Sequence, residues 1–306
     1  MSGNARSQLQ IGWVGVGRMG LAMAHRLAAA GLDLTAFNRS PEKAQPLRAY
    51  GAKIAATLAD LGACDVIFVM VSTDEAVEEV VAGPRGLLAQ AHDRLRLVID
   101  CSSISVDMSA GLRKVLARAG VAFLAAPVSG NPHVVEAGQA SFVASGPKAS
   151  FDEIEPLLLL IGHAATYVGE GELARIAKIC HNVWLGALTQ ALAEVLVLAQ
   201  KAGMTRTAFL DFINRSALGS PYTRVKTPQW RALDFSATFT APLMRKDMDL
   251  GLALADRMDA PMPLSTLTRE IILSQINQGF VDVDFSTLLL LQARSAGLEM
   301  KPEIER

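Results

Sequence analysis

The 306-residue sequence has little of several features that assign proteins to specialised classes. Its three cysteines, Cys64, Cys101 and Cys180, are too few and too widely spaced for a disulfide framework or a paired metal-ligand motif. The five histidines show no zinc-like clustering along the chain. We therefore expect no catalytic metal ion and no disulfide bond.

The sequence also lacks an excess of charge of either sign and lacks long apolar runs. With 29 Lys and Arg against 30 Asp and Glu, the formal net charge is −1, so no global field attracts nucleic acid. Apolar runs such as 66–71 and 157–161 are far shorter than the roughly 20 residues that span a bilayer. Residues 1–10 are polar and contain no apolar signal segment. We expect a cytoplasmic protein that binds neither nucleic acid nor membrane.

A glycine-rich segment, Gly15-Val16-Gly17-Arg18-Met19-Gly20, lies between a predicted strand and a predicted helix. The apolar run Ile11–Val14 precedes it, and residues 21–30, which are mostly helix formers, follow it. Strand, turn and helix therefore occur in the order that a dinucleotide-binding fingerprint requires. A glycine-rich turn that binds no ligand is the alternative.

Each glycine of this turn has a separate physical role. Gly15 permits the tight turn, Gly17 lets the backbone approach a pyrophosphate, and Gly20 lets the helix pack closely on the strand. The unpaired N–H groups at the helix N-terminus favour an anion there. We therefore predict a dinucleotide cofactor, with Gly15, Gly17, Arg18, Met19 and Gly20 as cofactor-binding residues.

The residues after the next predicted strand, 32–37, indicate which dinucleotide binds. An NAD enzyme usually has an acidic residue here for the ribose 2′-hydroxyl, but this chain has Asn38-Arg39-Ser40. A guanidinium offers a planar set of donors to a 2′-phosphate, and no carboxylate is present to repel it. We therefore predict NADP (NADPH), with NAD less favoured. A solvated arginine in a turn completed by Pro41 is the alternative.

The first part of the chain, to about residue 168, has an α/β pattern of strand-like runs alternating with helix-like segments. This pattern predicts a mostly parallel sheet with covered faces. The further strand candidates are 66–71, Leu97–Asp100, Ala122–Ala125 and 142–144. Short polar residues follow two of these runs. Ser72 and Ser103, together with Val71 at the end of the run 66–71, are candidates for the nicotinamide end of the cofactor site. Ordinary helix N-caps explain such residues about as well.

The second part of the chain, from residue 169, is predicted to be all helical. An apolar stripe from Leu173 to Leu198 predicts one helix that continues to Gly203. Thirty residues at about 1.5 Å each give roughly 45 Å, which suits the spine of a second domain. Residues 205–214, 246–258 and 264–278 also have helical patterns. The domain prediction is therefore 1–168 and 169–306.

Two groups of residues could carry chemistry. Lys178 and Asn182 are four apart on the long predicted helix, so they share a face, and the neighbours of Lys178 on that face are small or apolar. Partial desolvation would favour the neutral amine, as a proton donor and acceptor requires. A surface lysine that extends past an apolar patch is the alternative.

The second group is the turn that follows the predicted strand Ala122–Ala125. Its Ser129 hydroxyl and the N–H groups around Gly130 and Asn131 could converge on a substrate carboxylate. An ordinary surface turn interrupted by proline is the alternative.

Four collinear segments of the chain resemble the β-hydroxyacid dehydrogenases, a family that includes 3-hydroxyisobutyrate dehydrogenase and the glyoxylate and succinic semialdehyde reductases. The segments are residues 11–20, Pro127-Val128-Ser129-Gly130, Gly169-Glu170-Gly171 leading to Lys178 and Asn182, and Pro242-Leu243-Met244-Arg245-Lys246-Asp247. The resemblance covers nearly the whole chain and implies an N-terminal Rossmann domain, a long interdomain helix, an all-helical C-terminal domain and an active site in the cleft between the domains.

The resemblance also implies residue roles. Lys178 would be the acid and base, Asn182 would hydrogen-bond the substrate, and Lys246 with Asp247 would close over the nicotinamide. Ser129 and Gly130 would hold the substrate carboxylate. The family usually has glycines where this chain has Asn131 and Val134, so bulkier side chains could reshape the substrate pocket or add a donor.

The implied activity is hydride transfer between NADP(H) and a small 3-hydroxy acid or semialdehyde, by a homodimer or homotetramer. An imine reductase of the same fold is one alternative, although its proton donor is usually not lysine. A non-catalytic NADPH-binding sensor is another, although such a module would not need both Lys178 and Asn182.

Overall fold

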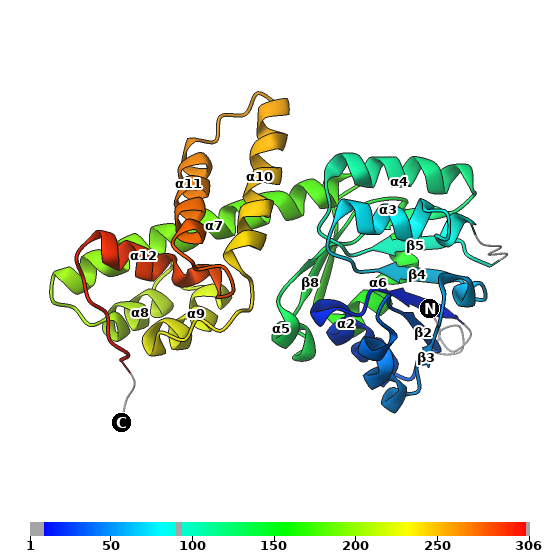
Figure 1. The fold of residues 1–306 in the computed structure, drawn as a ribbon, viewed down its shortest axis with the longest axis horizontal. Coiled ribbons are helices and arrows are strands. Elements are labelled where there is room, and N and C mark those ends of the chain that lie inside the picture. The colour runs from blue at the N-terminus through cyan, green and yellow to red at the C-terminus, as the bar shows by residue number, and fades with distance from the viewer. Residues whose placement is uncertain (1–8, 90–93, 304–306) are drawn as a thin grey trace. The chain divides into compact units, whose positions relative to one another are not determined.

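The computed structural model describes residues 9–89 and 94–303, so His92 lies outside the described residues. The chain divides into two compact units, one that ends at Lys178 and one that begins at Ile179. Figure 1 shows the elements of each. The first unit is built on a parallel six-stranded sheet in the order β3-β2-β1-β4-β5-β6. Its strands are β1 (Ile11–Val14), β2 (Leu34–Phe37), β3 (Lys53–Ile54), β4 (Val66–Val69), β5 (Leu97–Asp100) and β6 (Ala122–Ala125).

Because all six strands are parallel, their carboxyl ends lie along one edge, and the strand order reverses beside β1. This is the Rossmann arrangement, in which ligands bind at the carboxyl edge. A small second sheet follows, with β7 and β8 antiparallel and β8 and β9 parallel. Its strands are β7 (Val128–Ser129), β8 (Ser141–Ala144) and β9 (Ala164–Tyr167).

Helices cover both faces of the large sheet. Side chains alternate between the two faces along each strand, so apolar side chains lie on both faces and pack against helices. Trp13, Phe68 and Ile99 pack in one core with α2 (Arg18–Ala29), α5 (Pro132–Glu136) and α6 (Lys148–Ile161). Ile67 and Val98 pack in the other with α3 (Asp74–Ala82) and α4 (Val106–Arg118). Three 3-10 helices complete the unit, at Pro41–Tyr50, Leu58–Leu61 and Leu87–Ala89.

Helix α7 (Leu173–Lys201) begins in the first unit and continues into the second. It is long and apolar enough to meet the length and composition criteria for a membrane span. However, 56% of its most apolar window is buried inside the structure, as in the core helix of a folded domain. Its C-terminal half packs in a core with α8 (Arg206–Arg215), α9 (Pro221–Ala232) and α12 (Leu288–Ser295).

The remaining helices of the second unit are α10 (Ala241–Arg257), α11 (Pro263–Asn277) and the 3-10 helix η4 (Phe285–Thr287). Helix α10 approaches α7 closely because glycines lie at the contacts. A Cβ added at Gly186 would lie 3.0 Å from Met248 Sδ, and one at Gly251 would lie 2.2 Å from Val183 Cγ2. This approach brings the side chains of α10 onto those of α7.

The predicted fold class is confirmed, and β1, β5 and β6 have the predicted bounds. Some boundaries differ. The helix predicted over 21–30 begins at Arg18 because part of the glycine turn is itself helical, and the strand predicted over 66–71 ends at Val69. The helix predicted over 246–258 begins at Ala241, because Pro242 lies in the first turn, where a missing N–H costs no hydrogen bond.

Candidate functional site

The glycine turn between β1 and α2 has the shape of a phosphate cradle. Gly15 has φ 94°, and a Cβ there would lie 2.2 Å from the carbonyl oxygen of Met70. A Cβ at Gly20 would lie 2.0 Å from the carbonyl oxygen of Gly15. By contrast, a Cβ at Gly17 would meet no atom within 4 Å, so this side of the turn is open. The turn is therefore closed where it packs on the sheet and open where a pyrophosphate would approach.

The N-terminus of α2 is suited to an anion. No side chain caps it, and its first turn, which includes Arg18 and Met19, contains no acidic residue. The helix has 12 residues, long enough for its backbone dipoles to favour negative charge at this end. The turn and the helix end together fit a dinucleotide.

The residues after β2 divide into two roles. The Asn38 Oδ1 accepts a hydrogen bond of 2.8 Å from the backbone N–H of Val16, and its Nδ2 donates to the carbonyl oxygen of Ser40 at 2.9 Å. Asn38 therefore fastens this loop to the glycine turn. Arg39 is exposed, and its guanidinium makes no hydrogen bond or ion pair to any described residue. Its guanidinium is therefore available to a ligand at this loop.

The loops after β4 and β5 are held together by Ser102, the neighbour of the candidate Ser103. Ser102 is buried, and its hydroxyl accepts a hydrogen bond of 3.0 Å from the backbone N–H of Val71. Two helices begin after these loops, and their N-caps are Thr73 for α3 and Ser105 for α4. The candidates Ser72 and Ser103 therefore cap neither helix. Ser72 is exposed and Ser103 is half-buried, each in a loop at the carboxyl edge of the sheet.

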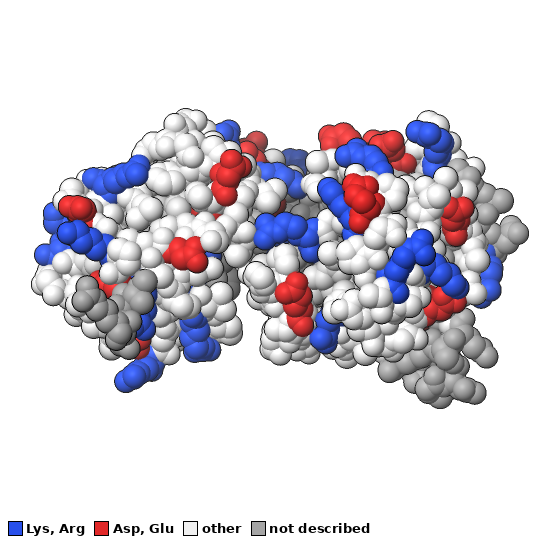
Figure 2. Space-filling model, turned by 60° about the horizontal axis from the view of Figure 1, so that its bottom comes forward, with Lys and Arg blue, Asp and Glu red and all other residues white. Residues whose placement is uncertain are grey.

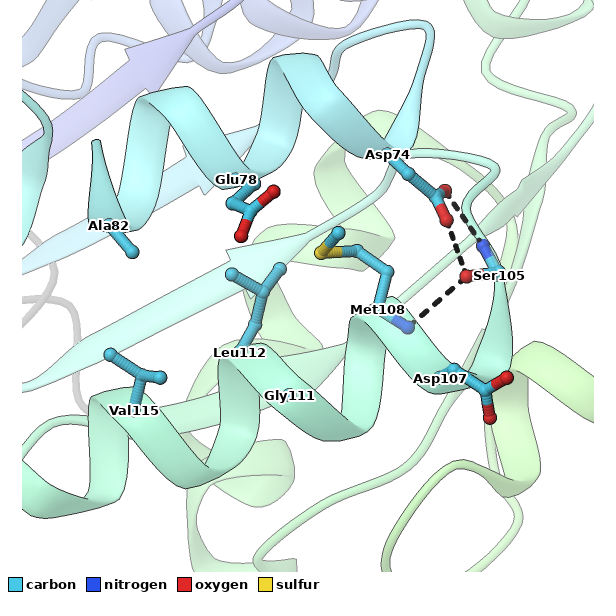
Figure 3. A pocket seen from close by; sticks show the side chains of 9 residues that line it. All are labelled: Asp74, Glu78, Ala82, Ser105, Asp107, Met108, Gly111, Leu112 and Val115. Atoms are coloured by element: carbon cyan, nitrogen blue, oxygen red, sulfur yellow. Dashed lines mark hydrogen bonds between the residues drawn. The ribbon is translucent and has the colours of Figure 1, made fainter.

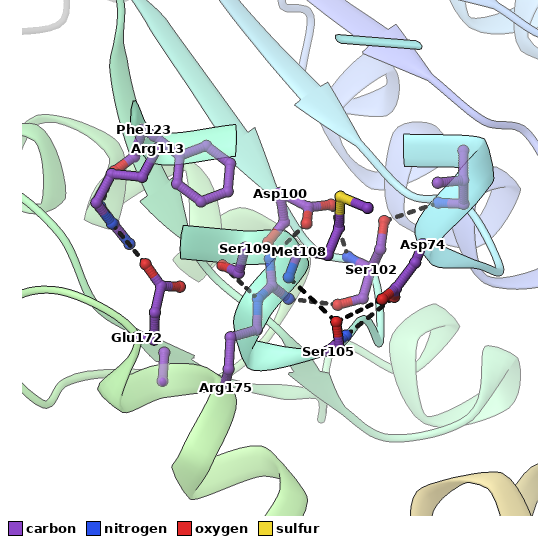
Figure 4. A network of polar contacts seen from close by, with 12 residues as sticks. Asp74, Asp100, Ser102, Ser105, Met108, Ser109, Arg113, Phe123, Glu172 and Arg175 are labelled. Carbon is purple, nitrogen blue, oxygen red and sulfur yellow. Dashed lines mark hydrogen bonds and ion pairs between the residues drawn. The ribbon is translucent and has the colours of Figure 1, made fainter. Parts of the chain in front are cut away.

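A buried ion pair joins the end of β5 to the first turn of α7 (Figure 4). Arg175 is 1% exposed and Asp100 is 0% exposed, and the guanidinium contacts the Asp100 carboxylate. Arg175 also donates to the carbonyl oxygens of Asp100 and Ser102 and to the Ser109 hydroxyl. The other Asp100 oxygen accepts the Ser102 N–H at 3.0 Å.

Arg113 and Ser145 fix the segment that leads into α7. Arg113 donates to Glu172 Oε1 at 2.7 Å and to the carbonyl oxygen of Gly171 at 2.6 Å. The Ser145 hydroxyl donates to the same carbonyl oxygen and accepts the Ala174 N–H. The half-buried Lys178 follows one helical turn later.

Asn182, the second candidate on α7, is bonded to a third candidate on α10. Asn182 and Asp247 are each 6% exposed, and the Asn182 Nδ2 donates to Asp247 Oδ2 at 2.6 Å. The Asn182 Oδ1 lies 2.9 Å from Nδ1 of the exposed His181. The amide of Asn182 is thus oriented from both ends, and the half-buried Lys246 adjoins Asp247 on α10.

The candidate carboxylate turn is shaped by the two residues that depart from the family pattern. Ser129 ends β7, and Gly130 has φ 145°. The Asn131 Oδ1 accepts the Val134 N–H at 3.0 Å and so caps α5, while a Cβ at Gly130 would lie 3.0 Å from Val134 Cγ1. Asn131 and Val134 therefore act together to fix the backbone next to Ser129 and Gly130.

Burial affects one thiol in the β5 loop. Desolvation, with a further contribution from the charge of Asp100, raises the pKa of the buried Cys101 thiol well above its usual range. This thiol therefore stays protonated and unreactive, and Cys101 fills space beside the candidate loops.

A separate cavity of about 410 Å³ lies between α3 and α4 (Figure 3). Three carboxylates, Asp74, Glu78 and Asp107, lie along it, and Asp74 accepts hydrogen bonds from the N–H and the hydroxyl of Ser105. Such a lining repels a pyrophosphate. Over residues 9–89 and 94–303, no group of three His, Cys, Asp or Glu side chains could hold a metal ion.

The surface charge is mixed. On the face drawn in Figure 2, basic and acidic side chains are interspersed, with no extended area of one sign. This agrees with the formal net charge of −1.

Comparisons with known proteins agree on the family. The model for the NAD binding domain of 6-phosphogluconate dehydrogenase matches residues 10–169. The model described as NAD-binding of NADP-dependent 3-hydroxyisobutyrate dehydrogenase matches residues 172–291. The chain is also 29% identical, over 92% of its length and 78% of the relative's, to glyoxylate/succinic semialdehyde reductase 2 of Arabidopsis thaliana.

Two further similarities bear on the cofactor and on catalysis. The solved structure of Psf3 in complex with NADP+ and 2-OPP matches with a TM-score of 0.81 and 29% identity, over 92% of this chain and 99% of that one. The human cytokine-like nuclear factor N-PAC is 30% identical over 86% of this chain but only 47% of its own length.

The first unit is thus a nicotinamide-dinucleotide-binding domain of the Rossmann type, and the class is that of NAD(P)-dependent oxidoreductases. The chain belongs to the β-hydroxyacid dehydrogenase family, as its four sequence segments indicated.

Proposed function

We propose that the chain is an NADPH-dependent reductase of small semialdehydes that carry a carboxylate, and that it oxidises the corresponding 3-hydroxy acids in reverse. The observation that carries the proposal is the buried Asn182–Asp247 hydrogen bond, one helical turn from Lys178 on the same helix. A module that only bound a dinucleotide would have no need for an amide oriented in this way beside a half-buried amine.

The proposed cofactor site uses residues of the first unit. The open side of the glycine turn and the N-terminus of α2 would hold the pyrophosphate, and Arg39 would contact the 2′-phosphate. Val71, Ser72 and Ser103 would line the nicotinamide end. When bound, NADPH would supply the hydride for the substrate carbonyl carbon.

The proposed chemistry of the protein is proton transfer and alignment. Lys178 would donate a proton to the carbonyl oxygen during reduction and remove it during oxidation. Asn182, oriented by Asp247, would hydrogen-bond the substrate beside Lys178. The substrate carboxylate would be held by Ser129, Gly130 and the side-chain Nδ2 of Asn131. Asn131 would use this nitrogen because its side-chain Oδ1 already accepts the Val134 N–H.

A kinetic screen tests this proposal. Glyoxylate and succinic, methylmalonic and tartronic semialdehydes are each offered with NADPH and with NADH, and loss of the reduced-nicotinamide absorbance is followed. We expect turnover of at least one semialdehyde and a higher kcat/KM for NADPH. Faster turnover of cyclic imines in the same assay would favour an imine reductase instead.

A second candidate is a dinucleotide-binding module without catalysis, because N-PAC, a relative at 30% identity, is named as a nuclear factor and not as an oxidoreductase. NADPH binding measured by fluorescence, together with complete inactivity across semialdehydes, 2-oxo acids and hydroxy acids, would support that candidate over the enzyme.

We also propose that the chain works in the cytoplasm as a homodimer or homotetramer, without nucleic acid or membrane partners. Large apolar side chains exposed on the second unit, such as Trp184, Leu198 and Phe212, support self-association. Light scattering coupled to size-exclusion chromatography would measure the mass. A monomer at micromolar concentration would contradict the proposal.

A further inference from the structure

The Arg175–Asp100 pair has no part in the proposed chemistry, yet it lies where the proposed site is assembled. Both side chains are buried within the first unit, and the nearby helix α4 is capped by Ser105 and not by either of them. Desolvating two charges is costly unless good geometry and further hydrogen bonds compensate. Arg175 makes its further bonds to Ser102 and Ser109, which belong to the β5 loop and to α4.

The pair connects three segments at the carboxyl edge of the sheet. Asp100 ends β5, and its carboxylate holds both the Arg175 guanidinium and the Ser102 N–H. The Ser102 hydroxyl in turn accepts the Val71 N–H, which fixes the loop after β4. Figure 4 shows Arg175 reaching from the first turn of α7 into this network. The two loops assigned to the nicotinamide end are therefore bonded to the helix that carries Lys178.

The shape of the guanidinium suits this task. Its planar set of donors contacts a carboxylate, two carbonyl oxygens and a hydroxyl at the same time. A lysine ammonium is a point charge with three donors and would lose part of this set. Because Arg175 and Lys178 are three apart, they lie within one turn of the same helix.

We propose that Arg175 is a positioning residue, which fastens the β5 loop to the start of α7 and thereby sets the distance between that loop and Lys178. This inference rests on the proposed function for its catalytic consequence. The fastening itself is a property of the chain without cofactor and can be measured separately.

The first test is amide hydrogen exchange on the cofactor-free chain. In Arg175→Met, we expect residues 101–105 and the backbone N–H of Val71 to exchange faster by about tenfold or more. The variant loses the Arg175 bonds that fix Asp100 and Ser102, which accept the hydrogen bonds of the Ser102 and Val71 N–H groups. Lys226→Met is the matched control, since it breaks a buried ion pair in the second unit and should leave exchange at 101–105 unchanged. Unchanged exchange at 101–105 in Arg175→Met overturns the proposal.

The second test separates positioning from stability. Arg175→Met should lower kcat by about 100-fold while the dissociation constant for NADPH changes little, because a small misplacement of a reacting group is costly. The double variant Asp100→Asn with Arg175→Gln removes the buried charge and keeps neutral hydrogen bonds. It should recover the melting temperature but not kcat, and Arg175→Lys should give an intermediate kcat. Recovery of kcat together with the melting temperature would show a merely structural role and overturn the proposal.

Failure of the proposed function gives a different pattern. If the wild-type chain turned over no substrate, the proposed reductase activity would be wrong. Faster exchange at 101–105 in Arg175→Met would still show that Arg175 fastens the β5 loop to α7.

Discussion

Each unit of the molecule contains a buried ion pair between residues far apart in sequence, and the two pairs differ in what they connect. Arg175–Asp100 in the first unit joins a helix to two loops at the carboxyl edge of the sheet. Lys226–Asp284 in the second unit joins α9 to the segment just before η4, at a distance of 2.7 Å. The first network ends in loops that we assign to a ligand, whereas the second ends in backbone and hydroxyl groups of its own core.

The partners of Asp284 illustrate a purely structural network. Its carboxylate accepts bonds from Thr238, Ser286 and the backbone N–H of Phe239, besides Lys226. Lys226 also lies over the Phe285 ring. The comparison teaches that burial of a charge alone does not indicate function, since both pairs are buried. The groups hydrogen-bonded to each pair distinguish the two: loops assigned to a ligand in the first unit, and core groups in the second.

The largest expected effect concerns Lys178, which lies on α7 within one turn of Arg175. Lys178→Met should lower kcat by about 10²–10⁴-fold, because the proton donor is removed. NADPH binding and the melting temperature should remain near wild type. Steady-state kinetics, fluorescence titration and thermal unfolding measure the three quantities. An unchanged kcat would remove Lys178 from the mechanism.

For Lys226→Met we expect the reverse of Lys178→Met, a loss of stability with little change in kcat. Removing one partner leaves Asp284 buried without its counter-charge, and we expect the free energy of unfolding to fall by about 3–5 kcal/mol. Urea denaturation measures this loss. At a temperature where the variant remains folded, kcat should stay close to wild type. A selective loss of kcat would erase the difference between the two networks.

A smaller effect is expected at Arg39, which tests the cofactor preference. Arg39→Ala should raise the KM for NADPH by about 10- to 100-fold, the value of about one charge-assisted hydrogen bond, and should leave the KM for NADH nearly unchanged. Among residues 9–89 and 94–303, the exposed Arg48 side chain bonds only to Gln45, so Arg48→Ala is a matched control. Equal losses with both cofactors would contradict recognition of a 2′-phosphate.

The smallest effect is the pH dependence of the second network. Burial acts to raise the pKa of Asp284, but the Lys226 charge and the hydrogen bonds from Lys226, Ser286 and Thr238 outweigh it and hold this pKa below its ordinary value. Stability from this group is therefore present at neutral pH and lost as the pH falls through the folded-state pKa.

Urea midpoints between pH 7 and pH 3 measure this dependence. The wild-type chain should lose more stability over this range than Asp284→Asn, which has no carboxylate to protonate. If Asp284→Asn lost as much stability between pH 7 and pH 3 as the wild-type chain, the pH dependence would arise from other carboxylates.

The parts of the molecule that depend on neighbouring residues could be predicted from the sequence. The glycine turn follows from three glycines between a strand and a helix, and the bounds of β1, β5 and β6 follow from compact apolar runs. The spacing of Lys178 and Asn182 follows from one helical turn. Each feature requires only residues within a short segment.

Features that depend on distant pairs could not be predicted. The Asn182–Asp247 bond joins residues 65 apart, and the Arg175–Asp100 pair joins residues 75 apart, so no local pattern shows either one. Helix α9 was missed because it is polar and contains Pro228, and β3 and β7 were missed because each has two residues.

Hydride transfer itself can be followed with NADPH that carries deuterium at the transferable position of C4. We expect the hydroxy acid formed by the wild-type chain to carry one deuterium on its hydroxyl-bearing carbon, detected by mass spectrometry and NMR, and we expect Lys178→Met to form this product far more slowly. Bound NADPH that transfers no deuterium to any semialdehyde of the panel would show that the chain is not a reductase of these substrates.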